Sequence, residues 1–236
     1  VPHVNLYPDG NAFYLKQKLA AKLGVEPANL VLGNGSNEII EFVAHALLGG
    51  CGALTADRGD EGVAATNIVV SQYCFTIYPI VARMAGANVI TVPAQNYGHD
   101  LPAMLKAITT RTRIVFVANP NNPTGTLAPR AELIDFVNRV PDDVLLVLDE
   151  AYIEFLDDPV DLIPLIRLGA RKNLILMRTF SKIYGLAGLR IGYGIATAEL
   201  AAALEKIRQP FNANLLAQTA ALAALDDDEH VRKTRA

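Results

Sequence analysis

One stretch organises the sequence: Arg178-Thr-Phe-Ser-Lys-Ile-Tyr-Gly-Leu-Ala-Gly-Leu-Arg-Ile-Gly-Tyr-Gly194. It begins where an apolar run, residues 173–177, ends, and such a run is typical of a buried strand. Lys182 lies among hydroxyl-bearing and glycine residues, where a backbone can approach a ligand closely, and Arg190 follows farther along the stretch. A lysine near a second cation, in a partly dry site, can present a neutral amine, which is a nucleophile.

The same stretch carries groups that suit a phosphate. The hydroxyls of Thr179 and Ser181, together with the guanidinium of Arg190, could hold one by charge-assisted hydrogen bonds. An amine beside a phosphate site is what a protein needs to bind an aldehyde that carries a phosphate. Pyridoxal phosphate is therefore the expected cofactor.

Composition sets the broad class. The chain has 236 residues, of which 51% are hydrophobic and 19% charged, with a net charge of −3, which suits a soluble α/β domain with one large core. The absence of a basic cluster argues against a nucleic-acid partner, and the absence of a long apolar run or signal peptide argues against a membrane. Two cysteines, Cys51 and Cys74, show no metal-ligand spacing, so we expect no metal and a cytoplasmic location, with a single disulfide as the open alternative.

Apolar runs alternate with amphipathic segments along the chain. The predicted strands are residues 30–32, 68–70, 88–92, 113–118, 144–148, 173–177 and 191–195. The predicted helices are residues 11–23, 39–47, 78–85, 101–108, 129–140, 161–168, 198–208 and 214–225, and residues 49–66 are expected to form a loop. This alternation predicts a three-layer α/β sandwich with a mainly parallel sheet.

The domain organisation follows from the same pattern. Residues 1–225 are expected to form one large domain with an N-terminal arm, because no linker interrupts them. Residues 226–236 are highly charged and have the pattern of a helix that has only begun. We interpret them as the start of a second, truncated domain.

Five polar motifs follow predicted strands. In an open α/β sheet, ligands bind beyond the carboxyl ends of the strands, so these motifs are expected to meet in one pocket. They are residues 33–38, 73–78, 119–126, 149–152 and 179–182.

Each motif offers a group that a pyridoxal phosphate site requires. Asp149 ends a buried strand, where a carboxylate needs a partner, and the pyridine nitrogen could be that partner. Asn122 and Tyr152 could hydrogen-bond the 3-oxygen of the ring, and an aromatic side chain, Phe75 or Tyr73, could stack on its face.

The first of the five motifs completes the phosphate site. Gly35, Ser36 and Asn37 precede or begin a predicted helix, and the backbone amides at a helix start bind anions. They would add to the phosphate contacts of the stretch around Lys182.

Every one of these residues also has an ordinary structural explanation. A lysine after a strand is usually solvated, an aspartate there often caps a helix, and Phe75 and Tyr78 suit a core. The Asn-Pro motif taken alone is a turn, and Arg190 could pair with a carboxylate. The joint occurrence of all these residues at strand ends is what favours a site.

Taken together, the motifs resemble those of a known family. Asn119-Pro-Asn-Asn-Pro-Thr-Gly125, Asp149-Glu-Ala-Tyr152 and Ser181-Lys182 with Arg190 resemble the class I/II, fold-type I, pyridoxal-phosphate aminotransferases. Tyr7-Pro8 and the residues around the other motifs look most like the histidine-biosynthesis branch of that family. The resemblance implies a homodimer that transfers an amino group between glutamate and imidazole-acetol phosphate, or in the reverse direction.

The resemblance also implies roles for individual residues. Lys182 is the Schiff-base lysine and proton carrier, Asp149 pairs with the pyridine nitrogen, and Tyr152 contacts the 3-oxygen. The other implied cofactor contacts are Asn122 at the 3-oxygen, Phe75 on the ring face, Thr179, Ser181, Arg190 and the turn at Gly35, Ser36 and Asn37 at the phosphate, and Tyr7 at the phosphate of the partner subunit.

Two features depart from the family. Residues 49–67 are longer than the expected connector, and the chain contains no match for the arginine that the family's small C-terminal domain places on the substrate carboxylate. The alternatives are an aromatic amino acid aminotransferase, a pyridoxal-phosphate decarboxylase of the phosphothreonine type, and a fragment that binds cofactor without turnover.

Overall fold

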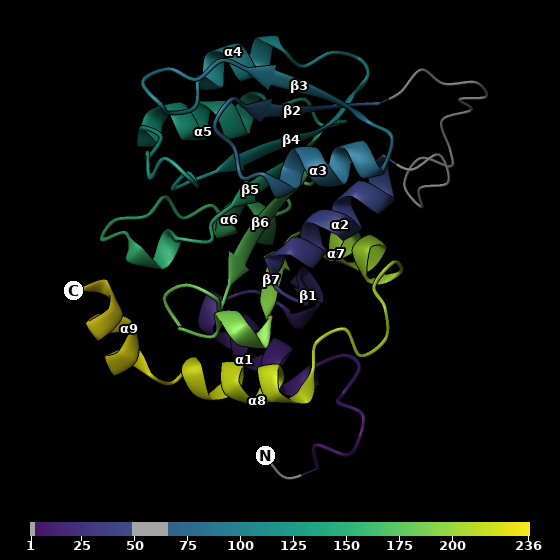
Figure 1. Ribbon diagram of the computed structural model, residues 1–236, viewed down its shortest axis with the longest axis vertical. Coiled ribbons are helices and arrows are strands. Elements are labelled where there is room, and N and C mark those ends of the chain that lie inside the picture. The colour runs from purple at the N-terminus through teal and green to yellow at the C-terminus, as the bar shows by residue number, and fades with distance from the viewer. Residues whose placement is uncertain (1–2, 49–65) are drawn as a thin grey trace.

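The computed structural model describes residues 3–48 and 66–236. The loop predicted for residues 49–66 lies outside these ranges except for residue 66. Cys51 also lies outside them. Figure 1 shows a sheet that runs through the middle of the molecule, with helices on both of its faces. The predicted three-layer architecture is confirmed.

The sheet of the described residues has seven strands in the order β1-β7-β6-β5-β4-β2-β3. Strands β6, β5, β4, β2 and β3 run parallel, whereas β7 is antiparallel to both β1 and β6. Their bounds are β1 Leu30–Gly33, β2 Asn67–Ser71, β3 Asn88–Val92, β4 Thr112–Ala118, β5 Leu145–Asp149, β6 Leu174–Thr179 and β7 Gly192–Ile195. The prediction of a mainly parallel sheet is thus confirmed, and each predicted strand is present.

Eight of the nine helices in the described residues fall into two groups, one on each face of the sheet. Helices α2, α3 and α7 pack into one hydrophobic cluster, and α1, α4, α5, α6 and α8 pack into the other. The helix bounds are α1 Phe13–Leu23, α2 Ser36–Leu47, α3 Ile77–Met84, α4 Leu101–Lys106, α5 Arg130–Arg139, α6 Ile163–Arg167, α7 Ala198–Glu205, α8 Leu215–Ala224 and α9 Asp228–Arg235.

Residue alternation in the strands explains why both faces are covered. In β2, Ile68 and Val70 belong to one cluster and Val69 to the other. In β4, the same alternation places Phe116 on one face and Val117 on the other. Successive strand side chains point to opposite faces, so a strand that is apolar throughout requires a helix layer on each side.

Local signals fix several helix ends. Gly24 ends α1 with a left-handed φ of 65°, and its N–H donates to the carbonyl of Ala20. Asp100, Thr197 and Asn214 cap the starts of α4, α7 and α8 with their side chains. Within residues 3–48 and 66–236 there are three 3₁₀ turns, η1 Pro27–Asn29, η2 Ile153–Phe155 and η3 Ala187–Leu189, which were not predicted, because a single turn is too short to show a hydrophobic period.

Residues 226–236, predicted as the start of a charged helix, contain α9, which begins after the side-chain cap of Asp227. Within the described ranges, none of the helices has the length and apolar character that crossing a bilayer demands.

Candidate active site

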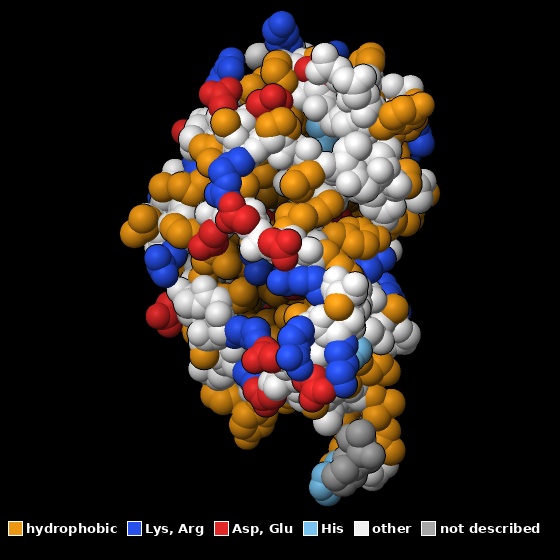
Figure 2. Space-filling view, turned by 90° about the vertical axis from the view of Figure 1, so that its left-hand side faces the viewer, with side chains coloured by type: hydrophobic (Ala, Val, Ile, Leu, Met, Phe, Trp, Pro, Cys, Tyr) orange, Lys and Arg blue, Asp and Glu red, His pale blue; other side chains and the backbone are white. Residues whose placement is uncertain are grey.

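A pocket of about 230 Å³ opens at the carboxyl ends of β4, β5 and β6. Figure 2 views the molecule from the side toward which the parallel strands point, and it shows a hollow with hydrophobic walls flanked by basic side chains. The pocket is lined by Ser36, Asn37, Phe75, Ala118, Pro120, Asn122, Asp149, Ala151, Tyr152, Thr179, Ser181, Lys182, Ala187 and Arg190. Four of the five predicted strand-end motifs therefore supply more than one wall residue, and the motif at 73–78 supplies Phe75.

Asp149 forms part of the pocket wall as the last residue of β5. Its side chain is 6% exposed, and its Oδ2 accepts a hydrogen bond of 2.7 Å from the Tyr78 hydroxyl. Its Oδ1 accepts a second bond, of 3.0 Å, from the Ala151 N–H. Burial raises the pKa of Asp149, while these two donors and the charge of Lys182 oppose the rise. A buried carboxylate of this kind gains most from a cationic partner in the pocket.

Tyr78 was interpreted from the sequence as a core residue, and the structure adds a polar role. Its ring is fully buried and stacks on Phe116 with the centroids 4.6 Å apart. Burial, followed by the charge of Asp149, raises the pKa of Tyr78 well above its usual value, so the hydroxyl remains a donor. No local signal reveals this contact, because the two residues lie 71 positions apart.

Lys182 and Tyr152 approach each other across the pocket. The Nζ atom of Lys182 lies 4.9 Å from the centroid of the Tyr152 ring, and both residues are half-buried. Lys182 comes from the loop after β6, and Tyr152 immediately precedes η2. In this position beside the Tyr152 ring, the Lys182 amine lies within the pocket, where it can reach a carbonyl group of a ligand.

A second group of pocket residues forms what we call the phosphate cradle: the start of α2 at Ser36 and Asn37, the hydroxyls of Thr179 and Ser181, and the guanidinium of Arg190. Thr179 Oγ1 lies 3.0 Å from Ser181 Oγ and accepts the Ser181 N–H at 3.1 Å. Arg190 Nη1 donates to the carbonyl of Ala187 at 3.0 Å and to Ser181 Oγ at 3.5 Å. Hydroxyls, amides and a guanidinium are the donors that bind phosphate.

Two glycines set the dimensions of the phosphate cradle. Gly35 precedes α2 with a φ of 72°, and a Cβ atom there would collide with Nη2 of Arg190. At Gly192 in β7, a Cβ atom would collide with the backbone nitrogen of Ser36. The turn therefore packs against β7 more closely than a side chain at Gly192 would allow, and at Gly35 the positive φ itself favours glycine.

The remaining predicted residues are placed as follows. Asn122 and Phe75 line the pocket, whereas Tyr73 stacks on Tyr97, with the centroids 5.6 Å apart, and does not. Tyr7 also lies outside it: its side chain is 83% exposed and stacks on Phe211. In the part of the chain that the structure describes, no cluster of three or more His, Cys, Asp or Glu side chains could hold a metal ion.

Glu150 and Glu154, which neighbour Asp149 and Tyr152 in the sequence, belong to a buried charged cluster that the sequence did not predict. Arg178 Nε donates to Glu150 Oε2 at 2.8 Å, and both side chains are largely buried. Burial raises the pKa of the neighbouring Glu154 carboxyl to about 7, and its Oε2 atom is buried without a hydrogen-bond partner. Burial thus favours the neutral form of the Glu154 carboxyl in the folded protein at pH values below its pKa of about 7.

The raised pKa of Glu154 predicts a pH-dependent stability. Its usual pKa is 4.5, so the folded state binds more protons than the unfolded state between about pH 4.5 and 7. This contribution to stability is complete below pH 4.5 and is lost as the pH rises through about 7. Between pH 5 and 8 we expect the Tm of the native protein to fall relative to that of Glu154→Gln, whose amide mimics the neutral carboxyl. Parallel Tm curves in thermal unfolding experiments would contradict the assignment.

Comparisons with known proteins place this pocket in a family. The model of the class I and II aminotransferases matches residues 2–236. The chain belongs to this family.

Curated relatives of this chain carry a more specific name. The chain is 50% identical to histidinol-phosphate aminotransferase of Moorella thermoacetica, over 98% of this chain and 56% of that protein. It is also 50% identical to histidinol-phosphate aminotransferase 2 of Pseudomonas fluorescens, over 97% of this chain and 58% of that protein. The chain spans between 56% and 60% of the length of such curated relatives.

Solved structures give the same picture of the fold. Histidinol-phosphate aminotransferase from Sinorhizobium meliloti, in complex with pyridoxal 5′-phosphate, superposes with a TM-score of 0.87 at 32% identity, covering 98% of this chain and 59% of that one. L-threonine-O-3-phosphate decarboxylase from Porphyromonas gingivalis superposes with a TM-score of 0.80 at 27% identity, covering 98% and 64%. Enzymes with different reactions thus share this architecture.

Proposed function

We propose that this aminotransferase binds pyridoxal phosphate and transfers an amino group from L-histidinol phosphate to 2-oxoglutarate, giving imidazole-acetol phosphate and L-glutamate, or the reverse. The observation that carries the proposal is one pocket that holds an amine at Lys182, a buried carboxylate at Asp149 and the phosphate cradle. The names of the relatives at 50% identity support the substrate pair, and the solved relative with pyridoxal phosphate supports the cofactor.

The residues of the pocket fit this cofactor. The phosphate cradle would hold the phosphate group, and the collision that a Cβ at Gly192 would cause with the backbone of Ser36 supports a cradle shaped by close backbone approach. Asp149 would pair with the pyridine nitrogen, and Phe75 would cover the face of the ring. Asn122 and Tyr152 would donate to the 3-oxygen.

The chemistry supplied by the bound cofactor is electron withdrawal from the substrate Cα and temporary storage of the amino group. The chain's own residues perform the remaining tasks. Lys182 Nζ would carry a proton between the substrate Cα and the C4′ carbon of the cofactor, as a general acid–base group. The carboxylate of Asp149 would hold a proton on the ring nitrogen, in a position where its own burial excludes competing water.

Further parts of the proposal concern the assembly and location of the protein. The exposed Tyr7 is proposed to reach the phosphate site of a partner subunit in a homodimer. Residues 226–236 are proposed to begin a small second domain, and the enzyme is proposed to act in the cytoplasm, where the free thiol of Cys74 would remain reduced.

A decarboxylase is the second candidate, because the superposition on L-threonine-O-3-phosphate decarboxylase covers 98% of this chain. The pocket geometry described above suits either reaction, since both begin with the same cofactor and lysine. The products distinguish them: a transferase yields an oxo compound, and a decarboxylase yields carbon dioxide.

The test is a half-reaction with protein in excess over substrate. The cofactor-loaded protein is mixed with L-histidinol phosphate, and we expect one equivalent of imidazole-acetol phosphate, followed by L-glutamate when 2-oxoglutarate is added. Preferential conversion of phenylalanine or tyrosine would favour an aromatic aminotransferase, and carbon dioxide from O-phosphothreonine would favour the decarboxylase. Cofactor binding without any product would mean that this chain alone lacks turnover.

A further inference from the structure

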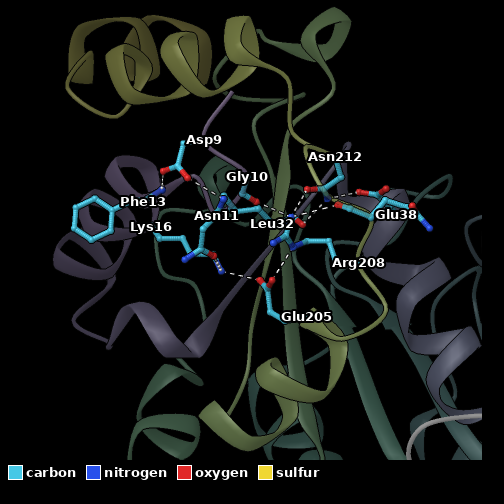
Figure 3. Close-up of polar contacts among 11 residues, drawn as sticks. Asp9, Gly10, Asn11, Phe13, Lys16, Leu32, Glu38, Glu205, Arg208 and Asn212 are labelled. Atoms are coloured by element: carbon cyan, nitrogen blue, oxygen red, sulfur yellow. Dashed lines mark hydrogen bonds and ion pairs between the residues drawn. The ribbon is translucent and has the colours of Figure 1, made fainter. Parts of the chain in front are cut away.

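A hydrogen-bond network outside the pocket reaches Glu38, which lies just after the start of α2 that belongs to the phosphate cradle (Figure 3). Glu38 lies in the first turn of α2, and its Oε2 accepts the N–H of Asn34 at 2.7 Å. Gly35, at the N-cap position, has no side chain to cap the helix. The Glu38 carboxylate therefore holds the backbone of the turn at Asn34. No capping side chain competes with a ligand for the amides of Ser36 and Asn37.

Asn212 holds this carboxylate in place. Its Nδ2 donates to Glu38 Oε2 at 2.6 Å and to the carbonyl of Leu32 at 3.0 Å. Leu32 belongs to β1, before the turn, and Glu38 belongs to α2, after it. The side-chain amide of Asn212 thus links β1 and α2, the two elements that the turn of the phosphate cradle connects.

The orientation of Asn212 is itself determined by its neighbours. Its Oδ1 accepts from Arg208 Nη1 at 3.0 Å, and the same nitrogen also donates to the carbonyl of Gly10 at 2.8 Å. Arg208 Nε pairs with Glu205 at 2.6 Å, and Glu205 pairs with Lys16 of α1 at 2.7 Å. Because the amide faces a guanidinium on one side and a carboxylate and a carbonyl on the other, only one orientation satisfies every partner.

We infer that Asn212 is a positioning residue for cofactor phosphate, acting through Glu38 and the turn before α2. The inference rests on the proposed function, since it takes the ligand of the phosphate cradle to be the phosphate of pyridoxal phosphate. The backbone of the turn lies so close to Gly192 that a Cβ atom there would collide with the Ser36 nitrogen, so the turn has no room to shift toward β7. A small displacement released by the loss of Asn212 would misalign the helix-start amides with respect to Ser181 and Arg190.

The test compares two probes that differ only in the phosphate, pyridoxal phosphate and pyridoxal. Each is titrated against the native protein, Asn212→Ala and the isosteric Asn212→Leu, which remove the hydrogen bonds without changing charge. We expect the Kd for pyridoxal phosphate to rise about tenfold in both variants, and the Kd for pyridoxal to stay within about twofold of the native value. Gln209→Ala, which deletes an exposed amide side chain from the same segment, is the matched control and should leave both constants unchanged.

The effect of Asn212 should also depend on Glu38. In a Glu38→Gln background, Asn212→Ala should raise the Kd for pyridoxal phosphate much less than in the native background, because both substitutions break the same contact. Comparing within that background cancels the change in charge at Glu38.

Each alternative outcome has a definite meaning. Equal losses for both probes would show that Asn212 only maintains the fold, and no loss for either would show that the turn does not need it; both results overturn the inference. If the native protein binds the two probes equally well, the phosphate cradle binds no cofactor phosphate, and the proposed function fails first. Thermal unfolding and circular dichroism identify variants that are unfolded, and the binding comparison is made with the variant of the pair that folds.

Discussion

Lys182→Ala is expected to eliminate covalent attachment of pyridoxal phosphate and to reduce turnover by about 10³-fold or more, because Lys182 is the only lysine among the described residues that line the pocket. Borohydride reduction of the cofactor-loaded native protein, followed by peptide mapping, should label Lys182. The variant should show neither the label nor the near-ultraviolet to visible absorbance of the lysine-bound cofactor.

The fold of Lys182→Ala should survive. The contact between Lys182 Nζ and the Tyr152 ring contributes only about 0.5–1 kcal/mol, and the side chain is half-buried. Lys206→Ala, at an exposed lysine beyond the end of α7, is the matched control and should keep the label and the absorbance. A label on another lysine in the native protein would refute the assignment of Lys182.

Asp149→Asn is expected to lower turnover by about 10²-fold or more and to weaken cofactor binding, while the protein remains folded. An amide has the shape of the carboxylate, so the contacts with Tyr78 and Ala151 can persist in altered form. It lacks the charge that keeps a proton on the ring nitrogen, and the electron withdrawal on which the reaction depends is lost.

Stopped-flow measurement of the half-reaction and a cofactor titration check this prediction. Asp157→Asn, at an exposed position in the loop after η2, supplies the comparison and should behave like the native protein. Unchanged turnover in Asp149→Asn would show that the buried carboxylate does not face the ring nitrogen.

Much of the fold was predictable because its signals are local. Apolar runs such as 88–92 and 113–118 indicate buried strands, and their order with the intervening helices leaves few alternatives to a parallel sheet. Helix ends were less accurate: the predicted helix 198–208 ends at Glu205, and Arg208 instead turns to bond Gly10, Glu205 and Asn212. A tertiary contact of this kind overrides propensity at a terminus.

The pocket was predictable to a similar degree, since strand ends in an α/β sheet share one edge. This rule brought Asp149, Lys182 and the turn before α2 together without knowledge of their distances. The choice between Phe75 and Tyr73 could not be made by this rule, and the resemblance to the family favoured Phe75, which is the one that lines the pocket.

The sequence by itself determined the strands, the mainly parallel sheet and the chemical groups at the strand ends, because these depend on the periodicity and residue types of short segments. Only the tertiary structure decided how those groups are held. Tyr78 reaches Asp149 across 71 residues, and Asn212 reaches Glu38 across 174, and each contact depends on the packing of elements that carry no mark of it in their own sequence. The residues around Lys182 indicated the site, and hydrogen bonds between residues far apart in the sequence fix its geometry.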